Sequence, residues 1–271
     1  MGKIRLDQRV FDLGMAESRE KAKALVMAGN VYVNGERQTK PGAPVADEAE
    51  ILVKGGKPPY VSRGGLKLEK ALDTFRVDPE GLVCVDCGAS TGGFTDCLLQ
   101  RGARHVFAVD VGYGQLAWSL RGDRRVTVME RTNARSLTPE QFPGPMDLAV
   151  MDMSFISLRL VLPAVKALLR PDGQVICLVK PQFEAGREKV GKKGVVRDPA
   201  VHREVLEQFL KSVSELGFVP WGLTFSPVRG PEGNIEYLAW LGQAGQAAPV
   251  DCAEVVRLSH KALDGGKGEA R

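Results

Sequence analysis

The chain has 271 residues, of which 44% are hydrophobic and 26% are charged, and its formal net charge at pH 7 is +4. This composition excludes a highly charged disordered chain, and it supplies enough apolar side chains for a folded core. The length predicts one large domain and a small one. The weakly basic charge is compatible with a polyanionic partner, but many enzymes with neutral substrates are equally basic.

No apolar stretch approaches the roughly 20 residues needed to cross a bilayer. The first residues, Met1 to Asp7, contain no apolar signal core. We therefore expect a cytoplasmic protein without a membrane partner. The five cysteines are an odd number and are expected to be reduced, mostly buried thiols. No second cysteine pair or histidine cluster follows Cys84 and Cys87, so no metal site is expected.

Two short helices are predicted at residues 5–13 and 18–28, where apolar residues recur at helical spacing. In the first helix, Leu6, Val10 and Leu13 are expected on one buried face. Each helix also carries a pair of basic residues four positions apart, which places both members of the pair on one face. These basic residues are Arg5, Arg9, Arg19 and Lys23.

A strand at residues 31–33 leads into the tight turn Asn34-Gly35, and a strand at residues 50–54 closes a small sheet. With the preceding helices, this stretch resembles the RNA-binding domain first known from ribosomal small-subunit protein four. The resemblance rests on Arg5-Leu-Asp7, Ser18-Arg19 and Gly29-Asn-Val-Tyr-Val-Asn-Gly35. It implies that residues 1–57 form a small α+β domain that binds structured RNA through its basic helical face. The alternative is that these charges only form a solvated surface.

Residues 58–65 belong to a glycine- and proline-rich segment that is predicted to be a flexible linker. In residues 66–245, strand-type apolar runs then alternate with helical patterns. The expected strands are at 82–87, 105–110, 126–129, 146–152 and 174–180, and the expected helices include 66–75, 158–169 and 198–216. This alternation predicts an α/β fold with a parallel, doubly wound, Rossmann-like sheet. A hairpin-like pair at 219–225 and 235–241 closes the domain, and residues 246–271 form a tail with one short helix and a mobile end.

The first strand of the large domain runs into Asp86-Cys-Gly-Ala-Ser-Thr-Gly-Gly-Phe-Thr95, which opens a helix. Ligands of such sheets bind beyond the carboxyl ends of the strands. The next strand ends in Asp110, 22 residues after Gly88, a spacing typical of an acid that binds an adenosine ribose. The glycine spacing departs from the dinucleotide pattern, so S-adenosylmethionine, which has no phosphates, is favoured over an NAD-type cofactor.

Asp86 is expected to engage the ammonium group of this cofactor, and Asn133 its adenine or ribose. The predicted cofactor-binding residues are Asp86, Gly88, Ala89, Ser90, Gly92, Gly93, Phe94, Asp110, Asn133 and Asp152.

Four ionisable residues stand where polar side chains are costly unless they are paired or used. Asp152 and Lys180 each end an apolar strand, one strand-helix-strand unit apart. Lys67 opens the first helix of the large domain, off its apolar stripe, and Glu236 lies shortly before the last strand. The set resembles the Lys-Asp-Lys-Glu tetrad of FtsJ-like RNA 2′-O-methyltransferases. The alternative is an ordinary ion-pair network at a sheet edge.

The whole chain to about Leu241 resembles the TlyA family, also called hemolysin A. The matching stretches are Tyr60-Val-Ser-Arg-Gly-Gly-Leu-Lys67, Asp86 to Asp96, Met151-Asp-Met-Ser-Phe-Ile-Ser157 and Gly194-Val-Val-Arg-Asp-Pro199. The resemblance implies 2′-O-methylation of ribosomal RNA, typically at cytidine, with Lys67, Asp152, Lys180 and Glu236 as the catalytic residues. We expect a monomer whose partner is ribosomal RNA or a ribosomal subunit.

A ribose 2′-hydroxyl must lose its proton before it becomes a good nucleophile. A neutral Lys180 could accept this proton, because desolvation and the nearby cation Lys67 both favour the neutral amine. Two carboxylates close by oppose that effect, so the sequence leaves open a charged Lys180 that stabilises the developing alkoxide. Arg63 and Arg197 are expected to contact RNA phosphates, and the alternative is that they are surface charges.

Three other functions fit these motifs less well. An inactive RNA-binding or ribosome-assembly protein would have no use for the four ionisable residues. A cytolysin would need membrane-spanning segments that the sequence does not show. A pseudouridine synthase can carry a similar first domain, but its chemistry does not use strand-ending lysines and a glycine-rich cofactor loop.

Overall fold

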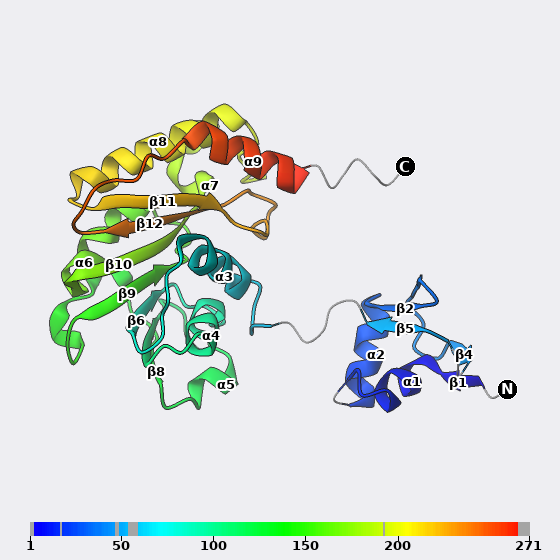
Figure 1. Ribbon diagram of the computed structural model, residues 1–271. Coiled ribbons are helices and arrows are strands. Elements are labelled where there is room, and N and C mark those ends of the chain that lie inside the picture. The colour runs from blue at the N-terminus through cyan, green and yellow to red at the C-terminus, as the bar shows by residue number, and fades with distance from the viewer. Residues whose placement is uncertain (1–2, 17, 47–48, 54–58, 192, 265–271) are drawn as a thin grey trace. The chain divides into compact units, whose positions relative to one another are not determined.

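The computed structural model describes residues 3–16, 18–46, 49–53, 59–191 and 193–264. The chain forms two compact units, residues 1–59 and 60–271 (Figure 1). Residue 58 of the predicted linker, the four residues before it and the predicted mobile end, residues 265–271, lie outside the described residues.

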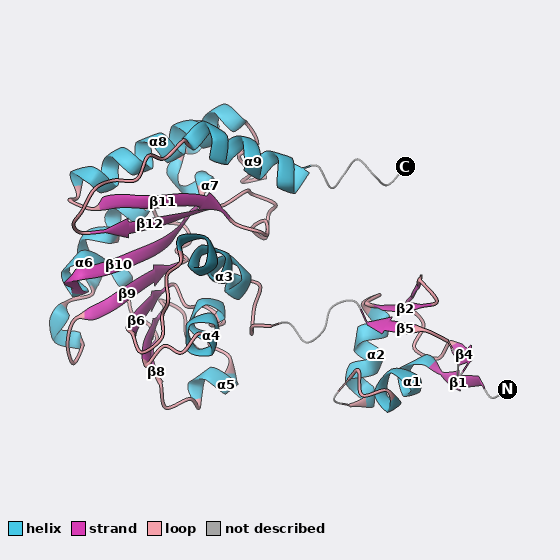
Figure 2. Ribbon diagram, in the orientation of Figure 1, coloured by secondary structure: helices cyan, strands magenta, loops and turns pink. Residues whose placement is uncertain are grey.

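The first unit combines two helices with short antiparallel strands (Figure 2). Its helices are α1 (Leu6–Asp12) and α2 (Arg19–Met27), and its strands are β1 (Lys3–Arg5), β2 (Val31–Val33), β3 (Glu36–Gln38), β4 (Pro44–Ala46) and β5 (Ile51–Val53). Strand β2 lies between β3 and β5, and β1 pairs with β4. The Ser18 hydroxyl caps α2 by accepting a hydrogen bond from the Lys21 backbone N–H at 3.2 Å.

Buried aliphatic residues from both helices and from the strands form the core of this unit. They are Leu6, Val10, Ala22, Val26, Val31, Val45 and Ile51. Burying each large aliphatic side chain contributes about 1.5–3 kcal/mol. The prediction that Leu13 shares this face is wrong, because α1 ends at Asp12 and the Leu13 side chain is exposed beyond the helix.

The second unit is built on a seven-stranded sheet in the order β11-β12-β10-β9-β6-β7-β8. The strands are β6 (Val83–Cys87), β7 (His105–Val109), β8 (Val126–Met129), β9 (Met146–Met151), β10 (Leu169–Val179), β11 (Val219–Phe225) and β12 (Tyr237–Gly242). Strands β10, β9, β6, β7 and β8 run parallel, whereas β12 is antiparallel to both β10 and β11. This arrangement confirms the predicted α/β architecture and its closing hairpin-like pair.

Helices cover both faces of this sheet (Figures 1 and 2). They are α3 (Gly64–Phe75), α4 (Gly93–Gln100), α5 (Trp118–Arg121), α6 (Leu162–Leu168), α7 (Pro181–Glu184), α8 (Pro199–Glu215) and α9 (Cys252–Asp264), with 3-10 turns η1 (Ala134–Ser136), η2 (Pro139–Gln141), η3 (Leu158–Leu160) and η4 (Arg187–Lys189). One apolar cluster joins the sheet to α3, α4 and α5, and a second joins it to α6, α8 and α9. The Asp198 carboxylate caps α8 by accepting a hydrogen bond from the Ala200 backbone N–H.

The structure corrects both predicted boundaries of the large domain. Within the predicted linker 58–65, Tyr60 is buried against the core of the second unit and α3 already begins at Gly64. Within the predicted tail 246–271, the predicted short helix is present as α9, but it packs into the other core of the domain through Cys252 and Val256. Glycine and proline content suggested flexibility at residues 58–65, but packing against residues far along the chain decided the structure there.

The five cysteines are free, buried thiols, as the sequence predicts. Burial raises the pKa of Cys84, Cys87 and Cys177, which keeps these thiols protonated. Across the residues that the structure describes, no helix is both long enough and apolar enough to span a bilayer.

Candidate active site

The glycine-rich loop after β6 approaches the chain that follows β9 very closely. Gly88 has a φ of +84°, in the left-handed region that favours glycine. A Cβ atom at this position would lie 2.7 Å from the carbonyl oxygen of Asp152. Glycine is therefore required here for steric reasons, and the contact brings the carboxyl ends of β6 and β9 together.

A second close approach joins the first turns of α3 and α4. A Cβ atom on Gly93 would lie 2.8 Å from the backbone nitrogen of Gly65. The two helices can meet at this distance because Gly93 lacks a side chain. As a result, Lys67 on α3 lies beside the glycine-rich loop.

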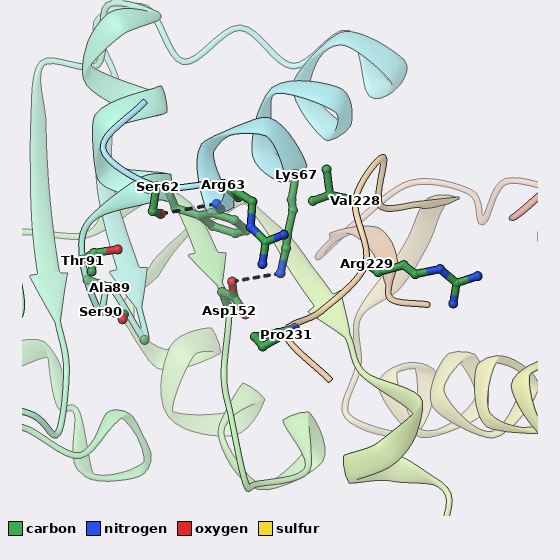
Figure 3. Close-up of a pocket in the computed structure, with 14 residues that line it drawn as sticks. Ser62, Arg63, Lys67, Ala89, Ser90, Thr91, Asp152, Val228, Arg229 and Pro231 are labelled. Carbon is green, nitrogen blue, oxygen red and sulfur yellow. Dashed lines mark hydrogen bonds and ion pairs between the residues drawn. The ribbon is translucent and has the colours of Figure 1, made fainter. Parts of the chain in front are cut away.

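A cavity of about 200 Å³ lies at this junction (Figure 3). Its wall comprises the loop from Gly88 to Phe94, Asp152, the start of α3 with Arg63 and Lys67, and the loop between β11 and β12. The cavity is therefore beyond the carboxyl ends of the parallel strands, where ligands of this fold class bind.

The four ionisable residues singled out in the sequence lie together, and two of them, Lys67 and Asp152, line this cavity. The Lys67 ammonium lies 2.6 Å from Oε2 of Glu236 and 3.7 Å from Oδ2 of Asp152. The Lys180 ammonium lies 2.6 Å from Oδ1 of Asp152. The charges therefore alternate along a continuous row from Glu236 through Lys67 and Asp152 to Lys180.

This row is largely shielded from solvent. Lys67 and Lys180 are each 7% exposed and Glu236 is 1% exposed. The Asp152 side chain is 21% exposed, the highest value among the four. Burial raises the pKa of Glu236, and the positive charge of Lys67 opposes that rise. Buried charges of both signs persist here because each ion has an oppositely charged neighbour.

Two of the predicted cofactor residues hold the loops beyond the strands. Asp110 accepts hydrogen bonds from the backbone N–H groups of Ser90 and Gly112, both at 2.7 Å. Asn133 caps η1, because its side-chain oxygen accepts a hydrogen bond from the Arg135 backbone N–H at 3.0 Å. Neither Asp110 nor Asn133 lines the cavity.

Asp86 is fully buried and also does not line the cavity. The Thr95 hydroxyl donates a hydrogen bond of 2.7 Å to its Oδ2, whereas Oδ1 has no hydrogen-bond partner among the described residues. Burial raises the pKa of Asp86 from 3.8 to about 7, and the hydrogen bond from Thr95 opposes the rise.

The raised pKa of Asp86 makes stability depend on pH. Because the pKa is higher in the folded chain than in the unfolded chain, this contribution to stability is complete below pH 4 and is lost as the pH rises to about 7. The loss approaches roughly 4 kcal/mol. Asp86→Asn cannot ionise and still accepts the Thr95 hydrogen bond. We expect its stability relative to the unsubstituted protein to rise from pH 4 to pH 7.5 in urea titrations, and a constant difference would contradict this account.

Several residues that no sequence pattern singled out also contribute to the site. Ser154 accepts a hydrogen bond of 3.0 Å from the Lys180 ammonium. The β11–β12 loop lines the cavity through Val228, Arg229 and Pro231. Figure 3 shows the Arg229 side chain extending away from Lys67 and Asp152. No local pattern marks this loop, because its position depends on strand pairing far along the chain.

The predicted RNA-contacting residues lie in several places. Arg63 is exposed and lines the cavity. Arg197 lines a separate open depression together with Lys189 and Lys193. In the first unit, Arg19 and Lys23 are exposed on α2. Arg5 pairs with Asp7 at 2.8 Å, and Arg9 is partly buried on α1. Their contacts with RNA stay predictions.

The winding of the sheet, the glycine-rich loop and the polar cavity beyond its strands define a Rossmann-like methyltransferase. The chain matches the FtsJ-like methyltransferase model over residues 60–243 and the S4 domain model over residues 4–51. The chain therefore belongs to the FtsJ-like methyltransferase family, with an S4 domain preceding the methyltransferase domain. Across the described residues, no group of three or more His, Cys, Asp or Glu side chains is arranged to hold a metal ion.

Several known proteins are similar to this chain over most of its length. "Putative rRNA methyltransferase YqxC" of Bacillus subtilis is 52% identical over 98% of both chains. "16S/23S rRNA (cytidine-2'-O)-methyltransferase TlyA" of Mycobacterium tuberculosis is 48% identical over 88% of this chain and 90% of its own. A solved structure of a "putative hemolysin from Streptococcus thermophilus" is 48% identical, with a TM-score of 0.78 over 99% of this chain and all of that chain.

Proposed function

We propose that this protein transfers a methyl group from S-adenosylmethionine to the 2′-hydroxyl of a cytidine ribose in ribosomal RNA. The observation that carries the proposal is the buried row of Lys67, Asp152, Lys180 and Glu236 beside the glycine-lined cavity. The name of the M. tuberculosis relative supports the substrate and the modified atom. Because ribosomal RNA is the proposed substrate, a cytoplasmic location is part of the proposal.

Residues at the carboxyl ends of β6 and β7 fit S-adenosylmethionine, although neither lines the cavity itself. Asp86 has a buried carboxylate oxygen without a hydrogen-bond partner among the described residues, which suits the ammonium group of this cofactor. Asp110 follows β7 and would accept hydrogen bonds from the ribose hydroxyls. When bound, the cofactor would supply an electrophilic methyl group on a sulfonium centre. The Asp86→Asn variant is therefore expected to bind the cofactor more weakly even where its fold is more stable.

Lys180 is proposed to remove the proton from the 2′-hydroxyl. Nζ of a neutral Lys180 would accept the hydroxyl proton as the ribose oxygen takes the methyl group and the demethylated cofactor leaves. Asp152 contacts this nitrogen at 2.6 Å and would orient it toward the hydroxyl. The alternative role of a charged Lys180, which stabilises the developing alkoxide, uses the same geometry.

The base role requires a neutral Lys180, and the charges of the row can balance in that state when one carboxyl group holds a proton. Burial raises the pKa of Glu236, so a proton on this residue is less costly than it would be in water. With Glu236 protonated and Lys180 neutral, Lys67 and Asp152 carry equal and opposite charges. The row then has no net charge, as it also has none when all four residues are ionised, so either role of Lys180 suits its buried position.

The S4 domain supports RNA as the substrate. Its exposed Arg19 and Lys23 lie one helical turn apart on α2 and are proposed to contact phosphate oxygens. In the second unit, the exposed Arg63 at the cavity wall is proposed to contact the phosphate of the modified nucleotide. Arg5, Arg9 and Arg197 are proposed as further RNA contacts.

The proposal is tested by incubating the protein with methyl-labelled S-adenosylmethionine and unmodified ribosomal subunits. We expect label in ribosomal RNA, and we expect alkaline digestion to release it as a dinucleotide that begins with cytidine. A methylated 2′-oxygen cannot attack the adjacent phosphate, so the labelled linkage resists alkali. Label on a base, or RNA binding without any transfer, would contradict the proposal; the second result would instead support a non-catalytic RNA-binding protein.

A further inference from the structure

Glu184, the last residue of α7, holds the loop that follows β9. Its Oε1 accepts a hydrogen bond of 2.8 Å from the Leu158 backbone N–H, and its Oε2 accepts one of 2.7 Å from the Ser157 hydroxyl. Burial raises the pKa of Glu184, and these two donors oppose the rise. The proposed chemistry does not itself use this carboxylate.

The other end of the same loop contacts the proposed base. The Lys180 ammonium donates a hydrogen bond of 3.0 Å to Oγ of Ser154. Lys180 immediately precedes α7, and Glu184 ends it. The loop and α7 are therefore joined at both ends, through Ser154 to Lys180 and through Ser157 to Glu184.

The backbone of this loop has an unfavourable conformation at Phe155, which contacts with the rest of the fold must stabilise. Phe155 has a φ of +64° although it carries a large side chain, and it is 90% exposed. A non-glycine residue in the left-handed region costs roughly 1–3 kcal/mol, and it persists only where its surroundings fix the backbone. The Glu184 hydrogen bonds, with a ring contact between Phe155 and Phe183 at 5.3 Å, supply that constraint.

We propose that Glu184 is a positioning residue for methyl transfer: by holding Ser157 and Leu158, it keeps Ser154 against the amine of Lys180. Ser154 and Asp152 together then fix the direction in which this amine faces the substrate hydroxyl. The inference rests on the proposed function, because it gives Lys180 the role of base. It differs from a purely structural role for Glu184, which would stabilise the fold without acting through Ser154.

The first test is a double-mutant cycle with Ser154→Ala and Glu184→Ala. We expect each substitution to lower the single-turnover rate of transfer by about tenfold, with the dissociation constant of S-adenosylmethionine unchanged. Because Glu184 acts through Ser154, the double variant should be no more than about twofold slower than either single variant. A double variant about 100-fold slower than the unsubstituted protein would mean that the two effects are independent, and it would overturn the proposal. A normal rate in Glu184→Ala would overturn it as well.

A conservative variant separates geometry from charge. In Glu184→Gln, the amide oxygen can still accept from Leu158, and the amide nitrogen can donate to the Ser157 hydroxyl. We expect Glu184→Gln to keep a rate within about threefold of the unsubstituted protein. A loss as large as that of Glu184→Ala would overturn positioning through these hydrogen bonds.

The second test needs neither RNA nor catalytic activity. Brief acetylation with acetic anhydride, read by mass spectrometry, reports how accessible and reactive each lysine is. We expect Ser154→Ala and Glu184→Ala to raise the labelling of Lys180 several-fold and equally, without a change at Lys70 on α3. Unchanged labelling of Lys180 in Glu184→Ala would overturn the inference. If the protein proves not to methylate RNA, the proposed function fails while this measurement still decides the Glu184–Ser154 connection.

Asp251→Ala provides the matched control for both tests. The Asp251 carboxylate accepts a hydrogen bond of 3.0 Å from the Glu254 backbone N–H at the start of α9, outside the cavity wall. Its loss removes a similar carboxylate-to-backbone contact from the fold. Transfer rate and Lys180 labelling are expected to stay normal in this variant, and changes that match those of Glu184→Ala would overturn the proposal.

Discussion

Replacing Lys180 by arginine is expected to lower methyl transfer at least about 100-fold, because a positioned general base typically contributes a factor of 10² to 10⁴. The Lys180 ammonium lies 2.6 Å from Asp152. Because arginine is also positively charged, the substitution retains this buried ion pair. However, its guanidinium cannot release a proton and so cannot serve as a base. Single-turnover assays at saturating cofactor measure the effect.

The pH dependence of the rate and a control substitution complete this test. A base at Lys180 requires the rate of the unsubstituted protein to rise with pH as the amine loses its proton. Lys70→Arg, also a lysine substitution in the second unit, should leave transfer unchanged, because Lys70 lies over the Phe225 ring rather than at the cavity. Full turnover by Lys180→Arg would show that the positive charge, and not proton removal, is what this position supplies.

Replacing Lys67 by methionine is expected to destabilise the second unit by roughly 3–5 kcal/mol, the usual cost of removing one partner of a buried ion pair. Glu236 is 1% exposed and would lose the ammonium that lies 2.6 Å from its Oε2. This loss of stability should be smaller at acidic pH, because protonation removes the negative charge of the unpaired, buried Glu236 carboxylate. Urea unfolding at pH 5 and pH 8 measures both effects.

A double substitution separates stability from catalysis. Glu236→Gln in the Lys67→Met background removes the unpaired charge and should recover most of the lost stability. Methyl transfer should be lost in both the single and the double variant, because both lack the Lys67 ammonium that lies between Glu236 and Asp152. Lys70→Met, on the same helix, is the matched control and should keep both properties. No destabilisation in Lys67→Met would mean that the row is not the buried network that the structure shows.

The sequence was sufficient to predict the elements whose patterns are local. Short apolar runs that end in a polar residue identified β6, β7, β9 and β10, and the structure confirms them. The same strand ends placed Asp152 and Lys180 one strand-helix-strand unit apart, and parallel pairing of neighbouring strands brings them within 2.6 Å. Their chemical roles stay predictions, because position alone does not show what a side chain does.

The remaining features depend on contacts between distant parts of the chain. The hydrogen bonds of Glu184 reach back 26 and 27 residues, and no periodic pattern indicates such a link. The burial of Tyr60 and the packing of α9 likewise depend on surfaces formed elsewhere in the second unit. Local composition therefore misplaced both ends of the domain.

The most direct test is a map of ribose methylation along ribosomal RNA from cells without this protein, with the protein restored, and with its Lys180→Arg variant. The account predicts one or a few 2′-O-methylcytidines that appear only when the unsubstituted protein is present. An identical map in all three cases, or full methylation by the variant, would contradict it.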